Sequence, residues 1–285
     1  MKILINGKAA DITLENEKTL GDVVSGIENW IFSTGSRIQR ICINGKDIPV
    51  DSLKEAFTIN ISEIENLEFF IRFWRELAAE ALGDLYETCL FYANASFDER
   101  SQISAAWRDS SAARFLCSDI PEVYNLALIT LSGESIAPSD FIIIIEERLR
   151  EVSDTEQEIN SIEEQVQITA KRMEELPLDM QTGKDKKAAE TLDIFSQLGK
   201  KLFRIFFIQK TDGLSMETLV IDDLPAKTFF EEFNSSLNEL YSAYENQDTV
   251  LAGDVAEYEL APKLLKFFNS IKCITKSLSK VESGL

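Results

Sequence analysis

The sequence predicts an α+β fold, in which a small sheet-containing domain precedes a mainly α-helical bundle with one long helix. Within residues 1–73, apolar positions switch repeatedly between a period of two and a helical period. From Trp74 onward the helical period persists, and no low-complexity linker interrupts the chain. We therefore expect a domain at 1–73, a connecting helical region at 74–138 and an antiparallel helical bundle at 139–285.

A β-hairpin is expected at the start of the chain. The run Ile3–Ile5 is β-prone, and Ala10–Leu14 alternates between apolar and polar residues. Asn6-Gly7 lies between these two runs. This dipeptide is the strongest short-range hairpin signal, because both turn positions must accept a positive φ.

A helix and two further strands follow. Thr19 is placed to cap the helix. A strand at Ile38–Ile43 ends in a second turn at Asn44-Gly45, and a last strand is expected around Leu67–Ile71. The apolar stripe of the helix comprises Leu20, Val23, Val24, Ile27, Trp30 and Ile31.

The order hairpin, helix, strand, short connection and final strand resembles the ubiquitin-like β-grasp family. The repeated Ile-x-Ile-Asn-Gly-Lys, at Ile3–Lys8 and Ile41–Lys46, supplies the two turns of this resemblance. The resemblance implies one helix packed across a mixed sheet. Conjugated or sulfur-carrying members expose a C-terminal Gly-Gly, whereas this chain continues into helix and ends Ser283–Leu285. A modifier role is therefore not expected.

Several helices are predicted in the connecting region. Ser96 and Asp98 are typical of a helix start, and Pro121 predicts another helix that ends near Gly133. The buried face of the helix that begins at Trp74 is expected to comprise Trp74, Ala78, Ala81, Leu85, Cys89 and Tyr92.

The long helix is predicted to begin at Pro138–Asp140. If it runs unbroken to Leu176, it is about 55 Å long. Glu156 and Glu163 occupy positions where a coiled coil needs apolar residues. We therefore expect a bundle helix that extends past its neighbours, not a free-standing coiled coil.

The bundle is completed by helices expected at 185–208, 225–244 and 250–278, with a kink or division at Pro262. Their apolar residues recur at spacings of three and four, which is typical of core packing.

Two stretches, 175–195 and 239–258, share the order helix, polar turn ending in Asp, helix. Asp185 and Asp248 are placed as N-caps. This similarity predicts a duplicated αα-hairpin.

The charge balance limits the classes of partner. The chain has 49 acidic and 29 basic residues, for a net charge of −20. Such a chain repels phosphate backbones and anionic lipid head groups, so neither nucleic acid nor membrane is an expected partner. A basic protein surface is favoured, and self-association is compatible with the long helix.

A cytoplasmic location is expected. The four cysteines (Cys42, Cys89, Cys117 and Cys273) form no closely spaced pair and are interpreted as small buried hydrophobes in a reducing compartment. The N-terminus becomes polar too early for a signal peptide. The longest apolar run, Phe141–Ile145, is too short to span a membrane.

The chain contains no histidine, the commonest general acid–base group and metal ligand. Ser-His-Asp and Cys-His catalysis are therefore excluded, as are metal sites that contain histidine. Lysine bases, paired carboxylates and oxygen-ligated cations remain open. No cofactor is predicted.

The best acidic cluster is Asp254, Glu257 and Glu259. It is interpreted as a solvated face or as a site for a basic partner or hard cation. Asp222 and Asp223 either join this cluster in space or cap the following helix.

The favoured hypothesis is a non-catalytic protein–protein interaction module: an acidic adaptor, scaffold or chaperone-like protein. The speculative partner-binding residues are Asp222, Asp223, Asp254, Glu257 and Glu259. The alternative is a histidine-free enzyme or divalent-cation-binding protein that uses carboxylates and lysine on the C-terminal helices, with Asp254, Glu257 and Lys263 as nominal candidates.

Overall fold

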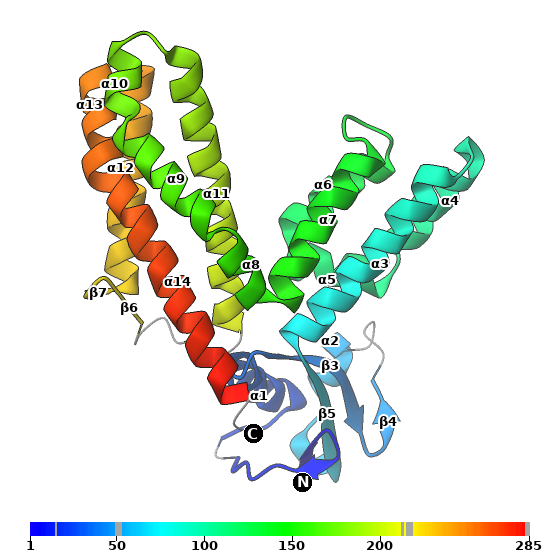
Figure 1. Ribbon diagram of the computed structural model, residues 1–285. Coiled ribbons are helices and arrows are strands. Elements are labelled where there is room, and N and C mark those ends of the chain that lie inside the picture. The colour runs from blue at the N-terminus through cyan, green and yellow to red at the C-terminus, as the bar shows by residue number, and fades with distance from the viewer. Residues whose placement is uncertain (15, 49–52, 212–213, 215–218, 283–285) are drawn as a thin grey trace. The chain divides into compact units, whose positions relative to one another are not determined.

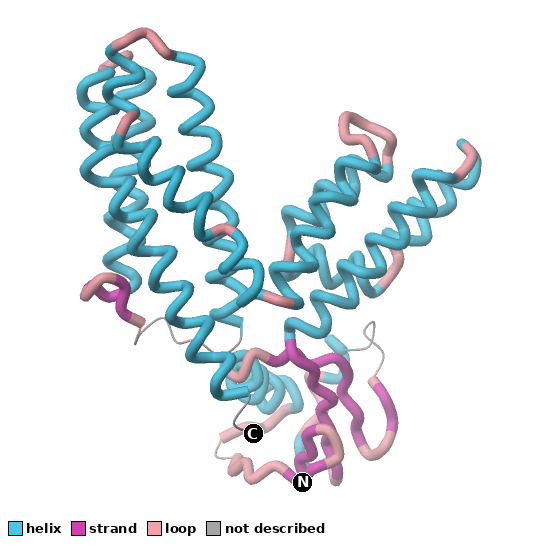
Figure 2. The backbone as a smooth tube through the Cα atoms, viewed as in Figure 1, coloured by secondary structure: helices cyan, strands magenta, loops and turns pink. Residues whose placement is uncertain are grey.

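The computed structural model describes the whole chain except residues 15, 49–52, 212–213, 215–218 and 283–285. It forms two compact units. The N-terminal unit comprises Met1–Leu149 with Thr211–Gly213, and the C-terminal unit comprises Arg150–Lys210 and Leu214–Leu285. Figure 1 labels the elements of each unit, and Figure 2 shows that strands are concentrated near the N-terminus whereas helices dominate the rest.

The N-terminal unit contains a mixed five-stranded sheet in the order β2-β1-β5-β3-β4. β1 and β5 are parallel, with Ile3 opposite Leu67, and the other neighbouring pairs are antiparallel. The strands are β1 (Lys2–Ile5), β2 (Lys8–Ala9), β3 (Ser36–Ile43), β4 (Lys46–Asp47) and β5 (Asn66–Phe73).

Both predicted Asn-Gly turns are confirmed. Asn6 and Asn44 have φ values of 47° and 50°, and the glycine after each has a φ of 79°. Each asparagine also bonds to the chain beside its turn. The Asn6 side chain exchanges two hydrogen bonds with the backbone of Ile71, whereas Asn44 Oδ1 accepts from the amides of Glu65 and Asn66.

The second strand is shorter than predicted. The alternation at Ala10–Leu14 gives no strand beyond Ala9. Only one further ladder bond forms, from the Ala10 amide to the Ile3 carbonyl. Ile12 and Leu14 instead pack on the core from a loop, which satisfies the same apolar pattern without strand pairing.

Helix α1 (Leu20–Ser33) packs against the sheet. Thr19 caps it as predicted, and the Asp22 carboxylate accepts from the Thr19 amide to complete a capping box. Trp30 was expected in the apolar stripe but is 53% exposed, because it lies at the edge of the buried helical face. The core between the helix and sheet comprises Leu20, Val23, Val24, Ile27 and Ile31 with Ile3, Ile41, Leu67 and Phe69.

The rest of the N-terminal unit is mainly helical. The predicted face of α3, from Trp74 to Tyr92, is fully buried, which confirms the expectation from its spacing. The elements are α2 (Leu53–Ala56), the 3₁₀-helix η2 (Ile61–Glu63), α3 (Trp74–Asn94), α4 (Phe97–Arg108), α5 (Ser111–Asp119), α6 (Pro121–Leu131) and α7 (Pro138–Ser153).

The predicted 55 Å helix is wrong. The predicted span begins with α7 at Pro138 but divides into three helices, of which the later two are α8 (Thr155–Ser161) and α9 (Glu163–Glu174); α10 (Leu176–Gln181) begins where the predicted helix was expected to end. At the first break the Asp154 side chain accepts from the Gln157 amide and caps α8. The predicted end near Leu176 agrees with the structure, where Pro177 lacks the N–H that a longer continuous helix would need.

The C-terminal unit is a helical bundle whose core centres on phenylalanines. The Phe267 ring lies 4.9 Å from that of Phe203 and 5.3 Å from that of Phe230. The remaining elements are α11 (Asp185–Thr211), β6 (Val220–Ile221), β7 (Leu224–Pro225), α12 (Ala226–Glu245), α13 (Thr249–Asp254), the π-helix η3 (Val255–Leu260) and α14 (Ala261–Glu282).

The two predicted hairpin turns have the same backbone geometry. Gly183 and Gln247 follow the C-caps of α10 and α12 with φ values of 71° and 57°. Both turns have the hydrogen bonds of a Schellman motif. Asp248 caps α13 as predicted, but Asp185 lies inside the first turn of α11 and is not its N-cap.

The predicted division near Pro262 takes the form of a π-helical segment. A proline ring clashes with the carbonyl four residues earlier, here that of Tyr258. η3 includes Tyr258 and replaces α-helical geometry at that position.

The cysteine prediction holds for Cys42 and Cys89, which are buried, but not for Cys117 and Cys273, which are exposed. Burial raises the pKa of Cys89 to about 12. Burial and the hydrogen-bonded Asp47 carboxylate raise the pKa of Cys42 to about 11. Neither buried thiol is therefore ionised at neutral pH, which argues against nucleophilic chemistry at them.

Candidate functional site

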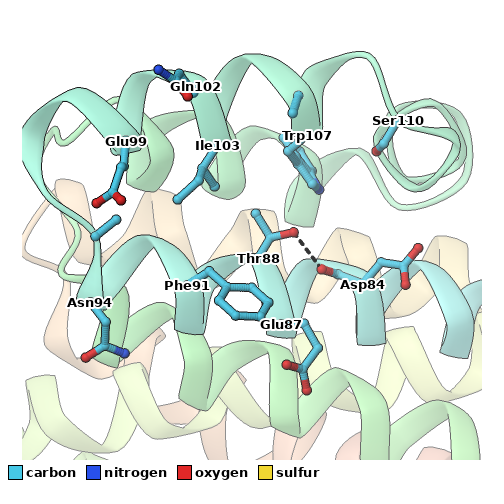
Figure 3. A pocket seen from close by; sticks show the side chains of 12 residues that line it. Asp84, Glu87, Thr88, Phe91, Asn94, Glu99, Gln102, Ile103, Trp107 and Ser110 are labelled. Carbon is cyan, nitrogen blue, oxygen red and sulfur yellow. Dashed lines mark hydrogen bonds between the residues drawn. The ribbon is translucent and has the colours of Figure 1, made fainter.

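A groove between α3 and α4 is the candidate functional site (Figure 3). Its volume is about 770 Å³. Figure 3 shows the Ile103 and Trp107 side chains extending from α4 toward α3. Both helices belong to the N-terminal unit.

The break between α3 and α4 is fixed by local interactions. The Glu99 carboxylate accepts from the amide and the hydroxyl of Ser96, which places the start of α4. The Arg100 guanidinium packs over the Tyr92 ring at 5.1 Å and donates to the Tyr92 and Ala93 carbonyls at the end of α3. These contacts hold the two helix ends together and define one end of the groove.

The groove carries uncompensated negative charge. Asp84, Glu87 and Glu99 line it, and no Lys or Arg is among the described residues that do so. Within the described part of the chain, Asp84 and Glu87 form no ion pair. Hydrogen bonds from Ser96 lower the pKa of Glu99, so this carboxylate is ionised at neutral pH.

Aromatic side chains accompany these carboxylates. Phe91 lines the groove and is 66% exposed, and Phe97, the first residue of α4, is 86% exposed. Trp107 is buried and stacks on Tyr124 with ring centroids 5.7 Å apart. Exposed aromatic rings beside unpaired charges are typical of protein-binding surfaces.

The structure places Asp222 and Asp223 in the turn of the β6–β7 hairpin. Their φ values are 51° and 63°, both in the left-handed region that this turn requires. Asp222 pairs with Lys266 at 2.5 Å. Neither residue caps α12, whose N-cap is Pro225, so the capping interpretation is wrong.

Asp254 ends α13, whereas Glu257 and Glu259 lie in η3. Glu259 pairs with Lys263, which also donates to the Ser236 hydroxyl at 3.1 Å. Glu257 accepts from Tyr258 and raises the pKa of that phenol. In the part of the chain that the structure describes, no cluster of three acidic or cysteine side chains is arranged to hold a metal ion.

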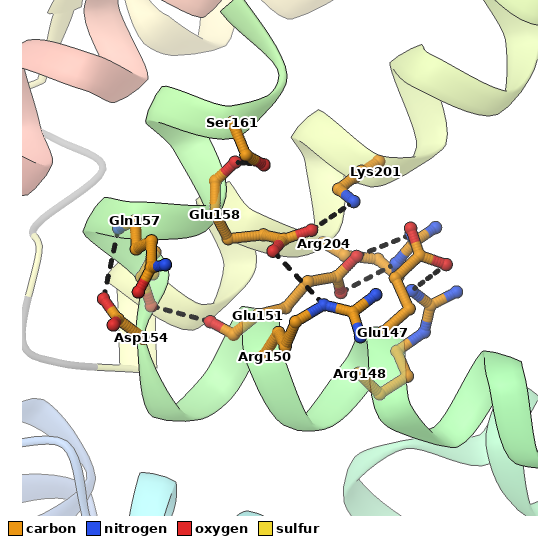
Figure 4. A network of polar contacts seen from close by, with 11 residues as sticks. Glu147, Arg148, Arg150, Glu151, Asp154, Gln157, Glu158, Ser161, Lys201 and Arg204 are labelled. Atoms are coloured by element: carbon orange, nitrogen blue, oxygen red, sulfur yellow. Dashed lines mark hydrogen bonds and ion pairs between the residues drawn. The ribbon is translucent and has the colours of Figure 1, made fainter.

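No sequence pattern indicates the ion network that the structure forms among Arg150, Glu151, Glu158, Lys201 and Arg204 of the C-terminal unit (Figure 4). Arg204 donates to both carboxylate oxygens of Glu151 at 2.7 and 3.1 Å. Lys201 pairs with Glu158 at 2.5 Å, and Arg150 reaches Glu158 at 3.5 Å. Glu151 is only 1% exposed, and a carboxylate can be buried to this extent only if a partner charge offsets the loss of its hydration. The network connects the last turn of α7, which from Arg150 onward belongs to the C-terminal unit, with α8 and α11.

The comparisons with known proteins define only uncharacterised classes. Residues 1–72 match a family described as the TP0873 N-terminal domain. Residues 157–270 match a domain of unknown function, DUF8042. In the sequence, the residues that line the candidate groove fall between these two matched regions.

An uncharacterized protein of Treponema pallidum (strain Nichols) is 23% identical to this chain over 262 residues, which cover 92% of each protein. No solved structure matches the chain. Among the described residues, no helix has the length and apolarity needed to cross a membrane.

Proposed function

We propose that residues 1–73 form a ubiquitin-like β-grasp domain. The support is the sheet order β2-β1-β5-β3-β4, the parallel pairing of β1 with β5, and the packing of α1 against the sheet. The proposal retains the three-part division of the chain at 1–73, 74–138 and 139–285.

We further propose that the protein is a non-catalytic, bacterial and cytoplasmic adaptor or chaperone-like protein, and that its α3–α4 groove binds a basic, amphipathic segment of another protein. One observation carries this proposal: the groove combines carboxylates that lack a counter-charge with exposed phenylalanine. A partner with Lys or Arg beside an apolar anchor satisfies both features.

The alternative, a histidine-free enzyme or cation-binding protein, has weaker support. Its nominal base, Lys263, is held by Glu259 and Ser236. Asp254, Glu257 and Lys263 line none of the described pockets. We therefore retain the binding function as the conclusion.

The test uses two synthetic amphipathic helical peptides of the same length, one with Leu and Lys and the other with Leu and Glu. Calorimetry should show saturable binding of the basic peptide only, weakening as salt rises. Glu87→Lys should weaken binding about fivefold or more, since one exposed ion pair contributes up to about 1 kcal/mol and reversal adds repulsion. Glu28→Lys, on the exposed surface of α1, makes the same change in net charge outside the groove and should leave binding unchanged. Equal affinities for the two variants would refute the groove as the binding site.

A further inference from the structure

A second groove lies within the C-terminal unit, between α11 and α12. Its volume is about 370 Å³. The walls are mainly apolar, with Phe195 and Phe203 on α11 and Phe233 and Leu240 on α12. The phenylalanine core beneath it is closely packed, since the Phe203 and Phe233 rings are 5.9 Å apart.

Gly199 keeps this groove open. It lies near the middle of the 27-residue helix α11, where glycine is less favourable than alanine. Packing does not require it, because a Cβ at this position would meet no atom within 4 Å. The missing side chain therefore adds free volume to a site that is otherwise lined by apolar groups.

Among the described residues that line the groove, Lys200 is the one charged residue. Within the described part of the chain it forms no ion pair, although the protein carries a net charge of −20. A single unpaired cation beside an apolar groove is complementary to a ligand with one negative group and an apolar body.

The size of the groove favours a narrow ligand. A peptide helix has a diameter of about 10–12 Å with its side chains. The volume of about 370 Å³ lies near the lower end of the range for small-molecule sites. Lys200 and Leu192, which both line the groove, are eight residues apart on α11, or about 12 Å along its axis.

We propose that this groove binds a single-chain anionic amphiphile, of which a medium-chain fatty acid is the simplest example. The carboxylate pairs with Lys200, and the acyl chain lies along the phenylalanine-lined floor toward Leu192 and Leu240. The site is separate from the α3–α4 groove and does not depend on the function proposed for it.

The test is calorimetric titration of the full chain with hexanoate, octanoate and decanoate below their micellar concentrations. Burial of each methylene should tighten binding about fourfold, so octanoate should bind about 15-fold more tightly than hexanoate. Decyltrimethylammonium, which has the same chain length and the opposite charge, should bind more weakly than decanoate.

Two variants locate the site. Gly199→Leu should fill the groove and abolish decanoate binding, whereas Gly83→Leu, at an open helical position of α3, should not. Lys200→Gln, an exposed change that leaves the core intact, should weaken binding about two- to fivefold. Absence of saturable decanoate binding, affinity independent of chain length, or unchanged binding by Gly199→Leu with a normal thermal transition would each overturn the proposal. Binding of an amphipathic peptide helix but no fatty acid would overturn it as well.

Discussion

Gly253 of α13 lies against Pro177 of α10, too close for any side chain. A Cβ at position 253 would lie 2.8 Å from Pro177 Cβ, 2.9 Å from Cγ and 3.0 Å from Cα. Carbon atoms in van der Waals contact are about 3.5–4.0 Å apart. Because one of these atoms belongs to the backbone, a side-chain rotation cannot relieve the clash, and Gly253→Ala must push α10 and α13 apart by about 0.5–1 Å.

The expected loss follows from two opposing contributions. Overpacking of this kind costs about 1–3 kcal/mol. Replacement of glycine by alanine within a helix gains about 0.5–1 kcal/mol. The net destabilisation of the C-terminal unit is therefore between about 0 and 2.5 kcal/mol, which lowers its melting temperature by up to about 10 °C.

The assay separates the two units of the protein. All three tryptophans, Trp30, Trp74 and Trp107, belong to the N-terminal unit, so their fluorescence follows its unfolding. Calorimetry should show the C-terminal transition moving down in Gly253→Ala while the fluorescence transition stays in place. Gly199→Ala adds a Cβ that would meet no atom within 4 Å, so it should raise the melting temperature of the C-terminal unit. If Gly253→Ala also raises the melting temperature, the close contact with Pro177 is wrong.

Three further predictions concern polar contacts and pH. Glu151→Ala leaves Arg204 without its bidentate partner and should destabilise the C-terminal unit by about 2–4 kcal/mol in urea unfolding followed by circular dichroism. Asn44→Ala loses three side-chain hydrogen bonds and places alanine in a left-handed turn position, so the N-terminal unit should lose about 2–3 kcal/mol by tryptophan fluorescence. Pairing with Lys187 lowers the pKa of Asp179. A carboxyl group whose pKa is lower in the folded state than in the unfolded state stabilises the fold at pH values above its unfolded-state pKa. This stabilisation should therefore disappear as the pH falls below about 4. Asp179→Asn should remove this part of the pH dependence in calorimetry.

Exposed positions provide the controls for these variants. Glu156→Ala and Asn16→Ala should change stability by less than about 0.5 kcal/mol. Glu156→Gln should leave the pH dependence as in the parent protein. Losses of similar size at the control positions would show that the buried contacts do not carry the assigned energies.

Features that depend on a few neighbouring residues were predictable from the sequence. The Asn-Gly turns require positive φ locally, and the buried face of α3 follows from its period alone. The prediction of one long helix was wrong because the spacing of apolar residues does not change across a short break that leaves the apolar stripe on the same face. Asp154 carried the missing signal, because its side chain caps α8 at the first break.

The candidate groove was less accessible to prediction, because it depends on how α3 and α4 pack. A local hint was present in Phe91 and Phe97, two aromatic residues that lie outside the predicted apolar face of α3. The acidic residues chosen from the sequence were instead partly used in turns and ion pairs. Asp222, for example, pairs with Lys266, which lies 44 positions further along the chain. No sequence pattern links these two residues.

The parallel pairing of β1 with β5 has a consequence for biosynthesis. β1 lies inside the sheet, between β2 and β5, yet its principal partner is translated more than sixty residues later. The first residues must therefore wait, unpaired on one edge, until Phe69 has left the ribosome, while α1 is already free to form. For the same reason, deletion of the first five residues would remove an interior strand of the sheet.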